Sequence, residues 1–207
     1  WCFHQWYFEI YKIRELLVFY QKYKKGCRLC FFMLLFILSQ KNLPLAQAEV
    51  ASFYPIKKTE GHYAFANSSS LVSSNSKKYE QLAFTKEVYD VLFHCSAKDL
   101  FHYCEKYNWN KKVKKKTYKI ESDRHKQRIA SLLWSCVKNP KVQMKNPEVL
   151  IRFFFVDKTV YATTREWKNP NDFFHRKPHM RPGFFPASLD PQLALAMVNL
   201  SGVVKGT

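Results

Sequence analysis

From Met33 onward, the chain alternates between short apolar runs and stretches with helical spacing. The run MLLFIL at 33–38 has the length and apolar character of a buried strand. Asn42 is predicted to cap a helix that tolerates Pro44 in its first turn. The apolar positions of this helix recur at helical spacing: Ala46, Val50 and Phe53. Two further strands are predicted, over His62–Ala66 and Glu87–Phe93.

Two amphipathic helices are predicted in the second half of the chain. Ser96 is the expected cap of the first, whose apolar positions are Ala97, Leu100, Phe101 and Cys104. Ser122 or Asp123 is the expected cap of the second, whose apolar stripe is Ile129, Leu132, Leu133, Cys136 and Val137. The cysteines at 95, 104 and 136 lie in apolar patterns and are expected to be buried thiols.

The segment after the second helix is predicted to form strands. Val142 and Met144 alternate with polar residues, Val149–Val156 is strongly apolar, and Asp157-Lys158 turns into a hairpin return over Val160–Thr163. Strands alternating with helices at these lengths predict an α+β fold, with a ferredoxin-like unit over residues 33–110.

The last helix is predicted from its caps. Asp190 precedes Pro191 at the first helical position, and Gly202 can take the left-handed closing conformation. Leu193, Met197 and Leu200 are expected to share its apolar face, and Ala194 and Ala196 to allow close approach to a sheet.

Charge points to the class of partner. The chain of 207 residues carries 34 Lys and Arg against 16 Asp and Glu, a net charge of +18. This imbalance predicts a polyanionic partner, nucleic acid before an anionic membrane surface. Hydrophobic residues make up 47% of the chain, which is typical of a globular protein.

The positive charge is densest between residues 106 and 119, which include seven lysines. One interpretation is a solvated lysine face that discourages edge-strand pairing. The overall charge favours another, in which lysines contact phosphates and aromatic residues stack on bases. The predicted RNA-binding residues are Lys106, Trp109, Lys111, Lys112, Lys114, Lys115, Lys116, Tyr118, Lys119, Arg124 and Arg128.

Residues 1–32 differ from the rest and are interpreted as a leader upstream of a true start at Met33. A signal peptide ending near the LAQA segment (45–48) is the alternative. Cys2, His4, Cys27 and Cys30 are formally zinc-type ligands, but without a second tight pair no metal site is predicted. The apolar run 29–38 is too short to span a membrane, so a cytoplasmic protein without membrane contact is expected.

The segment VQMKNPEVLIRFFFVDKTVYAT, residues 142–163, resembles the core of a THUMP domain, the RNA-binding module of several tRNA-modifying enzymes. The opening MLLFILSQKNLPLAQAEV, the segment QLAFTKEVYDVL and the tail HRKPHMRPGFFPASLDPQLALAMVNLSGVVKG are similar to archaeal tRNA (guanine-10) methyltransferases. This resemblance implies a THUMP domain at 111–165, a linker at 166–186, and the start of a truncated Rossmann-like methyltransferase domain at 187–207.

The resemblance also implies a function. The module would bind the acceptor stem and 3′ end of tRNA as a monomer, while a domain beyond Thr207 transfers a methyl group from S-adenosylmethionine to a guanine. Phe185, Pro186, Ser188 and Leu189 would line one side of the cofactor site, and no residue is assigned a catalytic role. We therefore expect the 207 residues alone to bind no cofactor and to be inactive. A THUMP module of thiouridine, pseudouridine or acetylation systems is the alternative.

Overall fold

The computed structural model describes residues 33–67, 78–171, 173–180 and 188–202. Its strands are β1 (Met33–Leu38), β2 (Ile56–Glu60), β3 (Tyr63–Asn67), β4 (Thr85–Ser96), β5 (Tyr118–Ser122), β6 (Val149–Val156) and β7 (Thr159–Lys168). The α-helices of the described residues are α2 (Leu43–Phe53), α3 (Leu100–Lys106), α4 (Asn110–Val113), α5 (Lys126–Cys136) and α6 (Pro191–Ser201). Short 3-10 turns lie at η2 (Lys78–Gln81), η3 (Phe174–Arg176) and η4 (Pro178–Met180).

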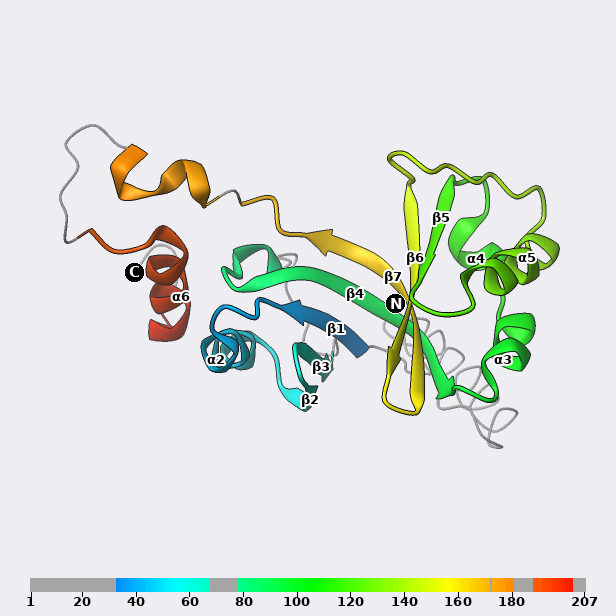
Figure 1. The fold of residues 1–207 in the computed structure, drawn as a ribbon, viewed down its shortest axis with the longest axis horizontal. Helices are drawn as coiled ribbons and strands as arrows, with labels where there is room; N and C mark the ends of the chain where they lie inside the picture. Colours follow the sequence, from blue (N-terminus) through cyan, green and yellow to red (C-terminus); the bar gives the residue numbers. More distant parts are fainter. Residues whose placement is uncertain (1–32, 68–77, 172, 181–187, 203–207) are drawn as a thin grey trace, which may run out of the picture.

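The strands form one mixed sheet in the order β2-β3-β1-β4-β7-β6-β5 (Figure 1). All neighbouring strands are antiparallel except β5 and β6, which are parallel. The long strand β4 pairs with β1 along its first half and with β7 from Glu87 to its end at Ser96. The predicted α+β fold class is therefore confirmed, with β4 and β7 joining both halves in a single sheet.

The α-helices cover one face of the sheet in two groups. Helix α2 covers β1 and β3 and α6 packs against α2, so that Phe36, Ala46, Val50 and Ala196 share one core. Helices α3, α4 and α5 cover the opposite end. Their core contains Phe93, Leu100, Trp109, Ile129 and Phe153.

The other face of the sheet is aromatic and curves onto itself. The Phe65 ring on β3 lies 4.6 Å from that of Tyr161 on β7, and the Tyr63 ring lies 5.7 Å from that of Phe154 on β6. These strands are three and four positions apart in the sheet, so only strong curvature brings the rings together. Register shifts in β1 and β4 are consistent with this bend, because bulges increase local twist.

The hydrophobic pattern located most of these elements. The strand Val149–Val156 has its predicted bounds, and the predicted strands at 33–38, 62–66 and 87–93 correspond to β1, β3 and part of β4. β2 was missed because its sequence, IKKTE, is largely polar and its central residues are exposed, as befits an edge strand.

Three local predictions were wrong. Asp99 and His125, rather than Ser96 and Ser122 or Asp123, occupy the cap positions of α3 and α5, and neither makes a side-chain cap bond. Val142 and Met144 form no strand. Val142 makes a single bridge to Tyr118, and both side chains are exposed, so there is no neighbouring surface for an alternating strand to cover.

The described residues contain no helix with the length and apolar character needed to cross a bilayer. No cluster of metal-ligating side chains occurs among them either; the four zinc-type residues of the leader lie outside this part of the chain. Cys95 and Cys104 are buried thiols as predicted, and Cys136 is half-buried. Burial raises the pKa of the Cys104 thiol well above its ordinary value, so this group is inert packing.

Candidate nucleic-acid interface

The lysine-rich stretch folds as a short helix and a turn. Trp109 and Val113 are four residues apart and both buried, so one side of α4 packs into the core while the lysines between and after them face outward. The Val113 amide donates to the Trp109 carbonyl (3.0 Å), and the chain then turns at Lys115, whose φ is 64°. A left-handed residue ends the helix and redirects the chain into β5.

Two hydrogen-bonded links hold this stretch in place. The Asn110 side chain donates to the Cys136 carbonyl (3.2 Å) and accepts from the Lys138 amide (2.9 Å). Glu148 accepts from the Thr117 amide (2.6 Å) and hydroxyl (3.1 Å). These bonds from Thr117 lower the pKa of Glu148 below its ordinary value. The lysines are therefore carried on backbone fixed at both ends.

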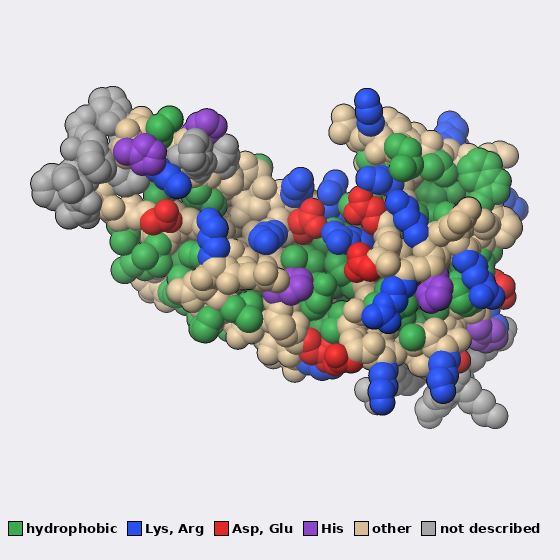
Figure 2. Space-filling view, viewed as in Figure 1, with side chains coloured by type: hydrophobic (Ala, Val, Ile, Leu, Met, Phe, Trp, Pro, Cys, Tyr) green, Lys and Arg blue, Asp and Glu red, His purple; other side chains and the backbone are tan. Residues whose placement is uncertain are grey.

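Most of the lysines keep a free charge. Lys112 pairs with Asp90 (2.9 Å) and Lys119 with Glu121 (2.8 Å). Within the described residues no ion pair involves the other five, which are all exposed: Lys106, Lys111, Lys114, Lys115 and Lys116. We call these five the lysine patch. In the face shown in Figure 2, Lys and Arg side chains gather over the end of the molecule that carries α3, α4 and α5.

The two predicted stacking aromatics are not at this surface. Trp109 and Tyr118 are each 1% exposed and belong to the core under α3, α4 and α5. The Trp109 indole donates to the Cys104 carbonyl (2.7 Å) and its ring lies 4.7 Å from that of Tyr107. Burial contradicts the predicted stacking role, because the core already occupies both ring faces. The spacing of Trp109 and Val113 at i and i+4 was the available sequence signal.

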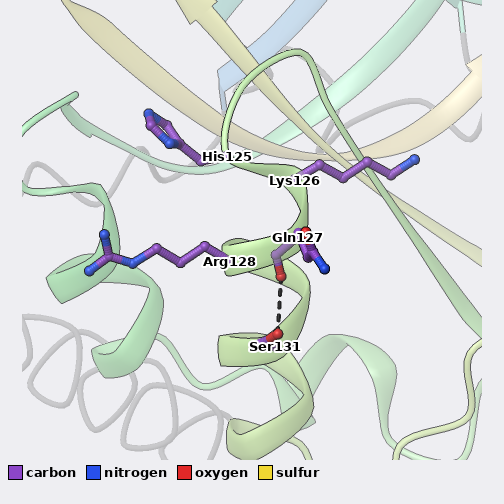
Figure 3. A pocket seen from close by; sticks show the side chains of 5 residues that line it. All are labelled: His125, Lys126, Gln127, Arg128 and Ser131. Carbon is purple, nitrogen blue, oxygen red and sulfur yellow. Dashed lines mark hydrogen bonds between the residues drawn. The ribbon is translucent and has the colours of Figure 1, made fainter.

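Arg124 and Arg128 flank the start of α5 at the surface. Arg124 lies 5.6 Å from the Phe155 ring centre, and Arg128 lies 3.9 Å above the Phe101 ring. Figure 3 shows Lys126 and Arg128 extending to opposite sides of a shallow depression lined by His125, Gln127 and Ser131. Stacking on aromatic rings orients both guanidinium groups without neutralising them.

Three further cations border the lysine patch and were not predicted from the sequence. Lys138, Lys141 and Lys145 are exposed on the segment between α5 and β6. The Lys138 amide binds Asn110, and the Lys141 carbonyl accepts from the Tyr118 amide (2.9 Å). The bonds of Lys138 and Lys141 to Asn110 and Tyr118 hold this segment against α4 and β5, although α5 separates it from the lysine patch in the sequence.

The polar edge of the curved aromatic face is neutralised internally. Glu87 lies 3.6 Å from Arg152 and 3.5 Å from Arg165, and it accepts a hydrogen bond from the Tyr89 hydroxyl (2.7 Å). Burial opposes ionisation of Glu121, but Lys119, Arg152 and Arg165 outweigh it and lower its pKa. Because these positive charges are paired with carboxylates, this edge attracts a polyanion less strongly than the lysine patch does.

The C-terminal helix has its predicted caps and a different buried face. Asp190 accepts from the Gln192 and Leu193 amides (2.9 and 3.1 Å), and Gly202 closes the helix with φ 71°. Met197 and Leu200, which were predicted to lie on one apolar face with Leu193, are exposed. Ala196 and Asn199 are buried instead, against α2 rather than a sheet.

Polar contacts hold α6 in that orientation. The Asn199 side chain donates to Glu49 (2.6 Å) and to the Gln81 carbonyl (2.9 Å), and the Gln192 side chain donates to the Ala83 carbonyl (2.9 Å). Of the predicted cofactor residues, Ser188 and Leu189 are exposed, and Phe185 and Pro186 lie outside the described residues. Their role stays a prediction, as does the division at residues 166–186 and 187–207.

Comparison with known proteins identifies the central part of the chain. The family model of the THUMP domain matches residues 85–165, from the start of β4 into β7. A tRNA (guanine(10)-N2)-dimethyltransferase of Methanothermobacter thermautotrophicus is 30% identical over 135 residues, covering 61% of this chain and 40% of the relative. The enzyme of the same name from Methanocaldococcus jannaschii is 32% identical over 91 residues, covering 44% of this chain and 26% of the relative.

The chain therefore spans 40% or less of the length of these curated relatives. Among solved structures, TrmN from Thermus thermophilus superposes with a TM-score of 0.55 at 15% identity, covering 81% of this chain and 54% of that protein. At that identity the likeness shows the fold alone. The predicted domain boundary between residues 110 and 111 stays a prediction, although the THUMP match begins earlier, at Thr85.

Proposed function

Because residues 85–165 form a THUMP domain in a chain homologous to archaeal tRNA (guanine(10)-N2)-dimethyltransferases, we propose that this chain is the tRNA-binding part of a tRNA guanine-N2 methyltransferase that uses S-adenosylmethionine. It binds the acceptor stem and 3′ end, so that a methyltransferase domain acts on a guanine elsewhere in the tRNA. The observation that carries the proposal is the lysine patch, five cations without an ion pair inside the THUMP match, four of which lie on backbone fixed at Asn110 and Thr117.

The chemistry of the patch fits phosphate. Lysine ammonium groups act as point charges toward phosphate oxygens, and each phosphate neutralised releases counterions into solution. Lys112 and Lys119 form ion pairs with Asp90 and Glu121, so the five patch lysines are the ones available to RNA. The net charge of +18 attracts any polyanion over a long range, and the lysine patch is the surface at which phosphates are bound.

Replacing all five patch lysines by glutamine tests this proposal. If about five phosphates are bound, log K for tRNA falls with a slope of about −4 to −5 against log salt, and the slope of the variant is expected to be much flatter. The matched control is glutamine at five exposed lysines elsewhere, which changes net charge equally: Lys41, Lys57, Lys78, Lys86 and Lys158. If the slope flattens equally in the two variants, tRNA binding depends only on net charge and not on the lysine patch, and the proposal is overturned.

The proposed register on tRNA has a separate test. Removing the unpaired 3′ nucleotides of a tRNA weakens binding more than replacing its anticodon loop, because the first change removes contacts and the second lies far from the bound stem. Filter binding or fluorescence anisotropy at one fixed salt concentration measures both. If both changes weaken binding equally, the chain does not select the acceptor end.

A further inference from the structure

We propose that Trp134 is the base-stacking residue of this interface, with an unpaired nucleotide of the bound RNA on its indole face and the adjoining phosphates beside Lys138 and Lys111. This inference rests on the proposed function and deepens it. Trp134 is 55% exposed, and among the Phe, Tyr and Trp side chains that the structure describes it is the only exposed one.

The exposure of Trp134 follows from its place on α5. Ile129 and Leu133 are the buried residues of this helix, and Val137 at its end continues their stripe. Trp134 follows Leu133 directly, so it is rotated about 100° away from the core. An exposed tryptophan keeps a large apolar ring face available for contact, and tryptophan is enriched at binding interfaces.

Two cations lie near the end of α5, the helix that carries Trp134. Lys138 follows the end of α5, and its amide donates to the Asn110 side chain (2.9 Å), which itself donates to the Cys136 carbonyl (3.2 Å). Asn110 immediately precedes Lys111 of the lysine patch. The end of α5 and the start of α4 are thus bonded together through Asn110, which brings the backbone of Lys138 close to the start of the lysine patch. No ion pair of the described residues involves either lysine.

This combination favours an unpaired nucleotide over other occupants. An indole face stacks on any base, and the adjoining ammonium groups bind the backbone phosphates. A base inside a duplex has no free face to offer, so the occupant is single-stranded. The positive surroundings complement RNA, whereas a protein partner or a second copy of this basic chain would have to bring acidic groups to meet unpaired lysines.

The test compares two RNAs with the same stem, one ending in an unpaired 3′ segment and one blunt. Trp134→Ala is expected to weaken binding of the first about tenfold and to leave the second nearly unchanged, since one stacked base is lost. Trp134→Phe retains most of the affinity because an aromatic face remains. Met197→Ala removes an equally exposed apolar side chain, 54% exposed on α6, and is expected to leave both affinities unchanged.

The salt dependence separates this inference from the proposed function. Trp134→Ala keeps the slope of log K against log salt, whereas the patch variant flattens it. If the patch variant loses tRNA binding and Trp134→Ala binds both RNAs like the unmodified chain, the stacking site is wrong and the proposed function stands. Equal loss on both RNAs, or a change in self-association in sedimentation experiments, also overturns the site. If the unmodified chain binds neither RNA, both proposals fail.

Discussion

Glu49 is a buried carboxylate that joins three parts of the chain. Its oxygens accept from the Ala83 and Phe84 amides (2.7 and 2.8 Å) and from the Asn199 side chain (2.6 Å), and the residue has no exposed surface. Three donors around one carboxylate replace the water that burial removes. This one residue therefore fixes α6 to the segment that precedes β4.

Replacing Glu49 by glutamine keeps the side-chain volume but exchanges one of the two acceptor oxygens for an NH2 donor. The new amide group donates where donors already point, so we expect a loss of about 2–3 kcal/mol in the free energy of unfolding, measured by urea denaturation. Gln47→Ala, half-buried on the same helix, is the control and is expected to cost under about 1 kcal/mol. A variant as stable as the unmodified chain would show that the Glu49 contacts contribute little.

The residues that the sequence misplaced share one cause. Lysines surround Trp109 and Tyr118 in the sequence, and this pattern predicts surface aromatics. In the structure a single turn of helix points Trp109 inward while its neighbours face out. A short amphipathic helix within a run of lysines is difficult to predict, because only two apolar positions indicate it. Trp134 was hidden in the opposite way, as one more apolar residue beside a strong stripe.

At the scale of the element, periodicity predicted strands better than helix faces. β6 is buried on both faces and reads as a continuous apolar run, so its bounds could be predicted. The buried side of α6 could not, because it is chosen by partners remote in sequence. Asn199 finds Glu49 and the Gln81 carbonyl, and these bonds turn Met197 and Leu200 to the outside.

At the scale of the whole molecule, the two halves of the sheet share a core that no local sequence pattern predicts. The ring centre of Phe154 on β6 lies 5.7 Å from that of Tyr63 on β3 and 5.0 Å from that of Tyr89 on β4, and Phe154 is 1% exposed. The long strand β4 joins the same two halves through its hydrogen bonds. The sequence predicted the elements on both sides, but closure depends on the curvature of the assembled sheet.

We therefore expect residues 33–168 to unfold as one cooperative unit rather than as separate N-terminal and THUMP parts. Phe154→Ala removes the central ring of the shared core and is expected to lower the free energy of unfolding by about 3–5 kcal/mol. Because the halves are coupled, hydrogen exchange in β1 and in β7 rises together in this variant, and the unfolding transitions seen by different probes coincide. Val142→Ala, a deletion at a side chain 49% exposed, is the matched control and leaves exchange in both strands unchanged. Faster exchange in β6 and β7 with β1 and β3 still protected would mean that each half has its own core, and that the contacts between Tyr63 and Phe154 stabilise the molecule only weakly.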